Sequence, residues 1–340
     1  MGIRIGRIET RNRVFLAPMS GVTDEPFRRV AHGLGAGLVV SEMVASEELV
    51  RQRPDMVRRA RGKDAVFPFV IQLAGREERW MGEGARIAQD LGADVIDINM
   101  GCPAREVTGG LSGSALMRDP VHALRLIAAT VAASNVPVTL KMRLGWDAAS
   151  QNAAELARAA EALGIAMVTV HGRTRCQFYK GKADWKAIRK VRDAISIPLI
   201  ANGDLFGEAD ARRMLAESGA DGVMMGRGAY GRPWALVSLA AALEGVGPLD
   251  GPGVAAQGEI VERHYDAMLS HYPRTHGMRI ARKHLGWYVA ELVRGKFLSS
   301  PQAARWRAVL MGETDPREVV VHLRALYRVA ANTEPEKVAA

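Results

Sequence analysis

The sequence has very few cysteines and no long apolar segment. Cys102 and Cys176 are the only cysteines among 340 residues, so a disulfide framework is excluded. Neither stands in a C-x-x-C pair or at the spacing of zinc ligands, and we expect no metal site. No stretch approaches about 18 apolar residues without a charge, and the first residues lack the apolar core of a signal peptide. These absences predict a cytoplasmic protein that does not contact a membrane.

Acidic residues are too few to balance the basic ones. The chain has 46 Lys and Arg against 37 Asp and Glu, which gives a formal net charge of +9. This balance suits an anionic partner, and nucleic acid is one candidate. The length of 340 residues, 48% of them hydrophobic, suggests one large domain plus a smaller one, or two medium ones. We expect a monomer.

Short apolar runs alternate with amphipathic stretches over the first 240 residues or so. The amphipathic stretches include 82–91, 120–134, 152–163 and 206–218. Near-continuous Val- and Ile-rich runs between such stretches are typical of parallel strands covered by helices. Eight repeats favour a TIM (β/α)8 barrel over a doubly wound open sheet, which usually has fewer strands. The predicted strands are residues 14–17, 38–41, 67–72, 95–99, 138–141, 168–171, 198–202 and 222–225.

The strand pattern stops after a segment rich in glycine and proline, residues 244–258, which we interpret as a linker. The chain beyond it has only helical periodicity, for example over 279–294 and from Asp315, an N-cap residue followed by a proline. We therefore predict a barrel domain over 1–243, a small all-helical domain over 256–331 and a flexible tail over 332–340.

Polar side chains stand where the predicted strands end. In a TIM barrel the chemistry lies at the carboxyl ends of the strands. Any one of these residues could simply mark the point where a strand meets solvent, but the whole set indicates a polar, planar ligand at that end. The set consists of Pro18, Met19, Ser20, Glu42, Gln72, Asn99, Cys102, Lys141, Arg143, His171, Arg173, Asn202, Gly203, Asp204, Gly226, Arg227 and Gly228.

Glycines follow the last two strands, at Gly203 and at Gly226 and Gly228. These are the loops in which barrels bind phosphate, and Arg227 could add a charge-assisted contact. The segment 226–231 also matches G-x-G-x-x-G, but it follows the last strand, so no βαβ unit can complete a dinucleotide site. A phosphate held there, with its ring over the barrel mouth, fits flavin mononucleotide (FMN).

Three side chains could then meet the edge of the flavin ring: Gln72, Lys141 and His171. A lysine beside the N1 and C2-carbonyl end would stabilise the negative charge of a reduced flavin. Cys102 has no base partner spaced around it, and an ordinary thiol is mostly protonated at neutral pH. The role of general acid is therefore favoured for Cys102.

Six segments resemble the tRNA-dihydrouridine synthases, in particular the bacterial DusB branch. The resemblance spans both predicted domains and rests on APMSGVTD at 17–24, NMGCP at 99–103, KMRLGW at 141–146, VHGRTR at 170–175, ANGD at 201–204 and GRG at 226–228. It implies an FMN enzyme that takes hydride from NADPH and reduces the C5=C6 bond of uridines in tRNA.

The resemblance also implies roles for single residues. Cys102 would give the proton to C5 while flavin N5 delivers hydride to C6, and Asn99 would contact the uracil. Arg143 and Arg173, at neighbouring strand ends, are expected to bind the substrate. The FMN-binding residues would be Pro18, Met19, Ser20, Gln72, Lys141, His171, Asn202, Gly203, Asp204, Gly226 and Arg227.

The helical domain carries a basic stripe. One side of the predicted helix 279–294 carries Arg279, Arg282, Lys283 and Arg294. This leaves Leu285, Tyr288 and Leu292 for the core. A basic face beside a catalytic mouth suits a phosphate backbone, so we assign tRNA binding to this domain. The target base must be turned out of the folded RNA to reach the barrel. Two alternatives stay open: a flavoprotein acting on a free pyrimidine, as dihydroorotate dehydrogenase does, and a non-catalytic RNA-binding regulator.

Overall fold

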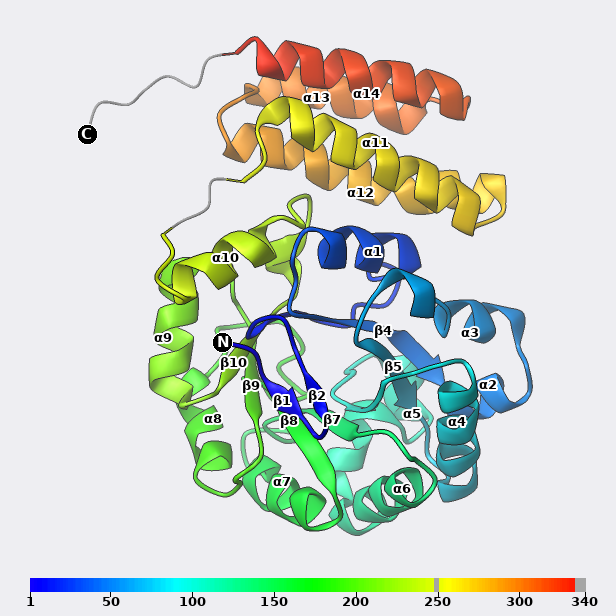
Figure 1. Cartoon of the computed structure of the whole chain (residues 1–340), viewed down its shortest axis with the longest axis vertical. Helices are drawn as coiled ribbons and strands as arrows, with labels where there is room; N and C mark the ends of the chain where they lie inside the picture. The colour runs from blue at the N-terminus through cyan, green and yellow to red at the C-terminus, as the bar shows by residue number, and fades with distance from the viewer. Residues whose placement is uncertain (248–250, 334–340) are drawn as a thin grey trace.

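The computed structural model describes residues 1–247 and 251–333 and confirms the TIM-barrel prediction. Eight parallel strands close into a barrel in the order β10-β3-β4-β5-β6-β7-β8-β9 (Figure 1). The ring closes where β10 pairs with β3, with Val223 opposite Val14. The barrel strands are β3 (Val14–Leu16), β4 (Leu38–Ala45), β5 (Phe69–Ala74), β6 (Val95–Met100), β7 (Val138–Arg143), β8 (Ile165–His171), β9 (Leu199–Asn202) and β10 (Gly222–Met225).

Helices surround the barrel because each has one apolar stripe to bury. Helix α4, for example, buries Met81, Ala85 and Ala88, which lie three or four residues apart on one face. The outer helices are α1 (Glu25–Gly33), α4 (Glu78–Asp90), α6 (Pro120–Ala132), α7 (Ala153–Ala162), α8 (Trp185–Arg192), α9 (Glu208–Ser218) and α10 (Ala235–Leu243). Shorter helices lie in the loops after strands: α2 (Ser46–Val50), α3 (Pro54–Arg59), η1 (Lys63–Ala65), α5 (Arg105–Gly109), η2 (Gly113–Arg118) and η3 (Arg227–Ala229).

A small hairpin that the sequence did not predict closes the amino-terminal end of the barrel. Strands β1 (Arg4–Ile5) and β2 (Ile8–Glu9) are only two residues each. In and next to this hairpin, Ile3, Ile5 and Ile8 pack in one apolar cluster with barrel residues such as Phe15 and Val70. The opposite end of the barrel, where the strands finish, stays free for chemistry.

Within residues 251–333, four helices form the carboxyl-terminal domain: α11 (Val254–His271), α12 (Arg274–Arg294), α13 (Ser300–Gly312) and α14 (Pro316–Ala331). Leu285 and Tyr288 are buried in its core, as predicted. Asp315 caps α14 through its side chain, also as predicted. Helix α11 starts at Val254, within the predicted linker; residues 248–250 of that linker and residues 334–340 of the predicted tail lie outside the described residues.

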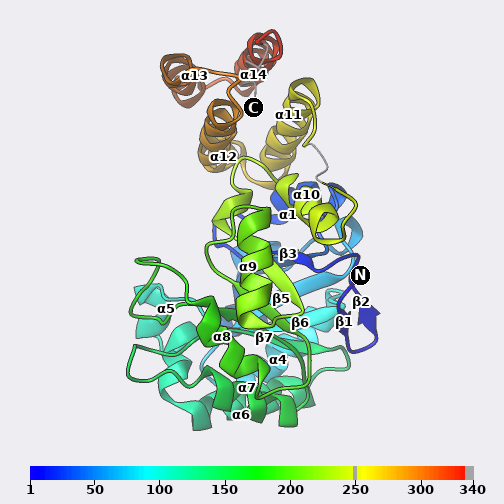
Figure 2. The ribbon, with the colours of Figure 1, turned by 90° about the vertical axis from the view of Figure 1, so that its left-hand side faces the viewer.

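The helical domain sits on the barrel beside α1. Phe27 of α1 packs against His264 of α11 and His284 of α12, with ring centroids 5.5 and 5.4 Å apart. Figure 2 shows α12 and α13 on the same side of the molecule as α5, which follows the carboxyl end of β6. The hairpin β1–β2 lies on the other side. The open end of the barrel and helix α12 therefore lie on the same side of the molecule. Within the described ranges, no helix has the length and apolar character needed to cross a membrane.

Candidate active site

The strand ends meet in a single cavity of about 580 Å³ at the carboxyl end of the barrel. It brings together side chains from residues more than 200 positions apart in the sequence. The predicted residues that line it are Pro18, Met19, Ser20, Gln72, Asn99, Cys102, Lys141, Arg143, His171, Arg173, Asn202, Gly203, Asp204, Gly226, Arg227 and Gly228. Glu42, also predicted at a strand end, does not line it. The three predicted tRNA contacts on α12 lie outside it.

A chain of buried hydrogen bonds explains why strand β6 ends in an amide. Asp97 accepts hydrogen bonds from Thr139 Oγ1 at 2.6 Å and from Gln72 Nε2 at 2.7 Å. Gln72 Oε1 in turn accepts from Asn99 Nδ2 at 2.8 Å. Asn99 Oδ1 then accepts from the backbone N–H of Cys102 at 3.0 Å. The Asp97 carboxylate, which accepts a hydrogen bond on each oxygen, thus fixes which end of the Gln72 side-chain amide donates. That amide in turn fixes the orientation of the Asn99 amide, which holds the loop of the thiol.

Burial raises the pKa of Asp97, and the hydrogen bonds from Thr139 and Gln72 offset part of that rise. Sequence reasoning missed Asp97 because it looked for functional side chains only at the ends of the strands, and Asp97 lies inside one. An acidic residue in an otherwise apolar strand was the available signal, since a buried carboxyl group needs partners.

The loop that carries Cys102 is also held from its other side. Ser114 donates from its backbone N–H at 3.1 Å and from Oγ at 2.7 Å to the carbonyl of Cys102. Gly113 has a φ of +59°, and a side chain there would come within 2.9 Å of that carbonyl. Burial raises the pKa of Cys102 by more than the charges of Arg143 and Lys141 lower it. The thiol therefore keeps its proton at neutral pH, as a general acid must.

Lys141 and Arg143 bring positive charge to the floor of the cavity. The Lys141 ammonium donates to Asn202 Oδ1 at 3.2 Å. Burial and, to a smaller extent, the charge of Arg143 lower the pKa of Lys141 to about 8, and Asp97 opposes the change. Arg143 donates to the carbonyl of Gly101 at 2.7 Å, which ties this strand end to the loop of the thiol. Burial lowers the pKa of Arg143 to about 10, so it stays charged.

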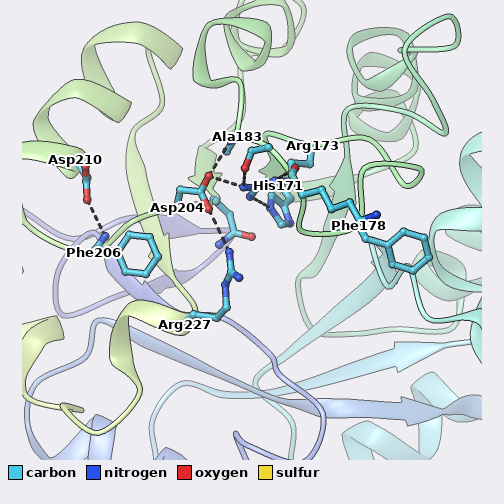
Figure 3. A network of polar contacts seen from close by, with 12 residues as sticks. His171, Arg173, Phe178, Ala183, Asp204, Phe206, Asp210 and Arg227 are labelled. Atoms are coloured by element: carbon cyan, nitrogen blue, oxygen red, sulfur yellow. Dashed lines mark hydrogen bonds and ion pairs between the residues drawn. The ribbon is translucent and has the colours of Figure 1, made fainter. Parts of the chain in front are cut away.

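His171, Arg173, Asp204 and Arg227 form a second polar cluster (Figure 3). Asp204 accepts from Arg173 Nη2 at 2.5 Å and from Arg227 Nη2 at 3.3 Å. Arg173 also reaches His171 Nε2 at 3.3 Å. Because a guanidinium only donates, Nε2 must be the acceptor, and the proton of the ring lies on Nδ1. Burial and the surrounding cations lower the pKa of His171 well below its ordinary value, so the ring is neutral.

Arg173 is buried more deeply than a substrate-contacting residue needs to be. Its side chain is 1% exposed, and it also donates to the carbonyls of Lys180 and Gly181. It therefore holds the loop after β8 to Asp204. The sequence placed Arg173 correctly at the end of the strand. It could not show that most of the N–H groups of Arg173 are already hydrogen-bonded to other parts of the protein.

Aromatic residues at the rim of the cavity were missed by sequence reasoning. Tyr179 is 54% exposed, and the guanidinium groups of Arg143 and Arg227 lie 5.5 and 5.3 Å from its ring centroid. Phe206, in the loop after β9, is 45% exposed and also lines the cavity. Single aromatics in irregular loops carry no periodic signal, so only the fold reveals that they share one rim.

The predicted tRNA contacts on α12 differ in their surroundings. Arg279 is exposed, and Arg282 is half-buried with a donor 3.4 Å from the carbonyl of Glu313. Lys283 points to the barrel instead, where its ammonium donates to the carbonyl of Gly21. Within residues 1–247 and 251–333, no three or more His, Cys, Asp and Glu side chains gather where they could hold a metal ion.

The fold and the cavity together define an enzyme of the TIM-barrel class, with its site at the carboxyl ends of the strands. The family model described as Dihydrouridine synthase (Dus) matches residues 15–332. The chain therefore belongs to the dihydrouridine synthase family and is a flavin-dependent oxidoreductase.

Curated relatives agree over nearly the whole chain. A protein of Rhizobium leguminosarum bv. phaseoli named probable tRNA-dihydrouridine synthase is 56% identical, over 93% of this chain and 95% of its own length. One of the same name from Rhodobacter capsulatus is 52% identical, over 96% and 98%. The tRNA-dihydrouridine synthase B of Xanthomonas axonopodis pv. citri is 43% identical, over 91% and 90%.

Solved structures show the same barrel at low identity. Histamine dehydrogenase from Rhizobium sp. 4-9 superposes with a TM-score of 0.55 at 14% identity, over 78% of this chain and 50% of that one. 6-Hydroxypseudooxynicotine amine oxidase from Pseudomonas geniculata N1 also gives 0.55 at 14%, over 77% and 52%. At this identity the likeness concerns the fold alone.

Proposed function

We propose that this protein is a tRNA-dihydrouridine synthase that uses FMN and NADPH to reduce the C5=C6 bond of uridines in tRNA. The observation that carries the proposal is the cavity, in which a protonated thiol, a fixed amide and a partly buried ammonium meet: Cys102, Asn99 and Lys141. The relatives' names supply the nucleic-acid substrate, and the excess of basic residues is consistent with it.

The residues of the cavity fit FMN. Four cationic side chains line it, and Asp204 is the one carboxylate among the lining residues that the structure describes, so an anionic ligand is favoured. Backbone also approaches closely: at Gly203, with a φ of +118°, a side chain would come within 2.8 Å of His171. We assign the phosphate to the loops after β9 and β10, where Arg227 stands at the start of η3.

We assign FMN binding to the residues predicted from the sequence: Pro18, Met19, Ser20, Gln72, Lys141, His171, Asn202, Gly203, Asp204, Gly226 and Arg227. The bound FMN would supply hydride from N5 to C6 of the uracil after taking it from NADPH. Lys141 places positive charge where it stabilises an anionic ring system. His171, neutral with its proton on Nδ1, offers one donor without adding charge.

Cys102 completes the reaction by giving its proton to C5 of the uracil. Addition of hydride at C6 leaves an electron pair at C5, in conjugation with the C4 carbonyl, and this pair takes the proton from the thiol. Asn99 holds the loop by accepting from the N–H of Cys102 and lies next to the thiol, where its amide can contact the base. Arg143 holds the same loop through the carbonyl of Gly101, and its Nη1 group donates to the carbonyls of Thr174 and Phe178. Its Nη2 group, at the cavity, would be the part that contacts the substrate.

The RNA would lie across the open barrel end and helix α12, which are on the same side of the molecule (Figure 2). Arg279 and Arg282 would contact the phosphate backbone, as on other surfaces that hold RNA by charge. The target uridine would be turned out of the tRNA into the cavity, with Tyr179 at the rim available for stacking. Arg173 and Lys283 are so occupied by the fold that we assign them to positioning instead of direct substrate contact.

A substrate comparison tests the proposed function. The purified protein should carry or take up FMN, oxidise NADPH, and form dihydrouridine in tRNA from a strain that lacks this gene. Free uridine and orotate are the matched small substrates. Turnover of either at the rate of tRNA would instead identify an enzyme of free pyrimidines. A protein that stays colourless after incubation with FMN would contradict flavin catalysis altogether.

A further inference from the structure

Helix α12 of the carboxyl-terminal domain touches two loops of the flavin site at once. Lys283 and Trp287 lie four residues apart and therefore on the same face of the helix. Lys283 contacts the loop after β3 at Gly21, and Trp287 contacts the loop after β10 at Tyr230. Strands β3 and β10 are neighbours at the seam where the barrel closes. One turn of helix thus spans that seam.

The Gly21 peptide is held from both sides. Its N–H donates to Glu42 Oε1 at 2.6 Å, and its carbonyl accepts from the Lys283 ammonium. The φ of Gly21 is +74°, so the chain turns sharply here. Glu42 belongs to strand β4, whereas Lys283 comes from the helical domain. Met19 and Ser20, which line the cavity, directly precede this peptide. Their position therefore depends on a residue of the other domain.

The second contact is a stack of aromatic rings. Tyr230 and Trp287 lie with centroids 4.0 Å apart and ring planes at 15°. Gly231, with a φ of +69°, fits so closely that a side chain would come within 2.2 Å of the Trp287 carbonyl. Tyr230 lines the cavity and follows Arg227 in the loop assigned to the phosphate. The stack thus fixes the far end of that loop.

A third contact anchors the end of the first loop. The Tyr272 hydroxyl, at the turn between α11 and α12, donates to Asp24 Oδ2 at 3.0 Å. Asp24 Oδ1 accepts from the N–H of Phe27 at 3.0 Å and so caps α1. Asp24 and Glu42 also lie close enough for their charges to act on Lys283. The segment from Gly21 to Phe27 is therefore attached to the helical domain at both ends.

We infer that Lys283 and Trp287 are positioning residues of the flavin site, so that the helical domain forms part of the cofactor-binding unit in addition to its assigned role with tRNA. This inference rests on the proposed function, because it needs FMN in the cavity. If docked α12 favours FMN binding, bound FMN must favour docked α12 by the same factor. The cofactor then stiffens the surface that receives the RNA.

Two matched variants separate this role from RNA binding. Lys283→Met and Arg279→Met each remove one positive charge from α12, one turn apart, but only Lys283 contacts the cavity loop. In the full chain stripped of flavin, FMN titrations followed by flavin fluorescence should show about tenfold weaker binding for Lys283→Met, because a charge-assisted hydrogen bond is lost. Arg279→Met should bind FMN like the wild type and tRNA less tightly. Lys283→Arg, which keeps a charged donor, should recover part of the loss.

Trp287→Leu and Tyr272→Phe are second probes if Lys283→Met does not fold, and both should weaken FMN binding. The reciprocal effect is measured by hydrogen exchange: FMN should slow exchange of α12 amides in the wild type more than in Lys283→Met. Equal FMN affinity for wild type and Lys283→Met, an equal loss for Arg279→Met, or no effect of FMN on α12 exchange would each overturn the inference. A wild type that binds no FMN would contradict the proposed function itself.

Discussion

Replacing Cys102 by alanine removes the thiol but leaves the hydrogen bonds that hold its loop. The amide of residue 102 donates to Asn99 Oδ1 at 3.0 Å, and its carbonyl accepts from Ser114 Oγ at 2.7 Å. Neither bond involves the sulfur. We therefore expect the Cys102→Ala variant to keep the shape of the cavity, to bind FMN with the affinity of the wild type and to oxidise NADPH at the wild-type rate.

The loss should fall on proton transfer alone. Since burial raises the pKa of Cys102, the wild-type thiol is fully protonated at neutral pH and its whole contribution as an acid is removed. A positioned general acid contributes about 10²- to 10⁴-fold, so dihydrouridine formation should slow by that factor. The assay is a single turnover: enzyme reduced with NADPH is mixed with tRNA lacking dihydrouridine, and the modified base is measured after digestion.

Cys176→Ala is the matched control, because Cys176 is exposed and does not line the cavity. It should reduce tRNA like the wild type. If Cys102→Ala did so as well, the proton would have to come from another donor, and the role assigned to the thiol would be wrong. Slower NADPH oxidation in Cys102→Ala would mean that the thiol also supports the flavin site.

Three further predictions address the floor of the cavity and the basic surface. Asp97→Leu leaves two buried donors without an acceptor and should lower the free energy of unfolding by about 3 kcal/mol, measured in urea; unchanged stability would contradict the hydrogen-bond chain. FMN affinity should fall as pH rises through about 8, where Lys141 loses its charge in the empty cavity, and a flat pH profile from fluorescence titration would refute this. The double variant Arg279→Glu, Arg282→Glu should weaken tRNA binding and reduce its salt dependence by about one to two ion equivalents while sparing flavin reduction; unchanged affinity would place the RNA elsewhere.

The barrel and its strand ends could be predicted because both follow from local patterns. Apolar runs of Val and Ile with helical stretches between them determine the strand count, and parallel strands necessarily bring their carboxyl ends to one edge. Residues as distant in sequence as Met19 and Arg227 could thus be placed in one cavity. The hairpin β1–β2 could not, since strands of two residues are too short to show alternation.

The sequence also could not tell which residues of a predicted helix face contact another domain and which face solvent. Helical periodicity put Arg279 and Lys283 on one stripe of α12, but it does not tell which part of a stripe meets another domain. The structure separates them: Arg279 faces solvent, while Lys283 reaches Gly21. The depth of Arg173 was equally invisible, because burial of a charged side chain depends on carbonyls supplied by loops without a sequence pattern.

The hairpin at the amino-terminal end of the barrel has a kinetic consequence. Because Ile3, Ile5 and Ile8 pack into that end, a flavin bound in the cavity would be reached, among the residues that the structure describes, from the carboxyl ends of the strands. If the protein uses NADPH and tRNA as proposed, both substrates would have to enter at that end of the barrel, and the two are too bulky to occupy it together. The two substrates would then bind one after the other. Excess tRNA should therefore act as a competitive inhibitor against NADPH, and double-reciprocal plots of the initial rates should give parallel lines.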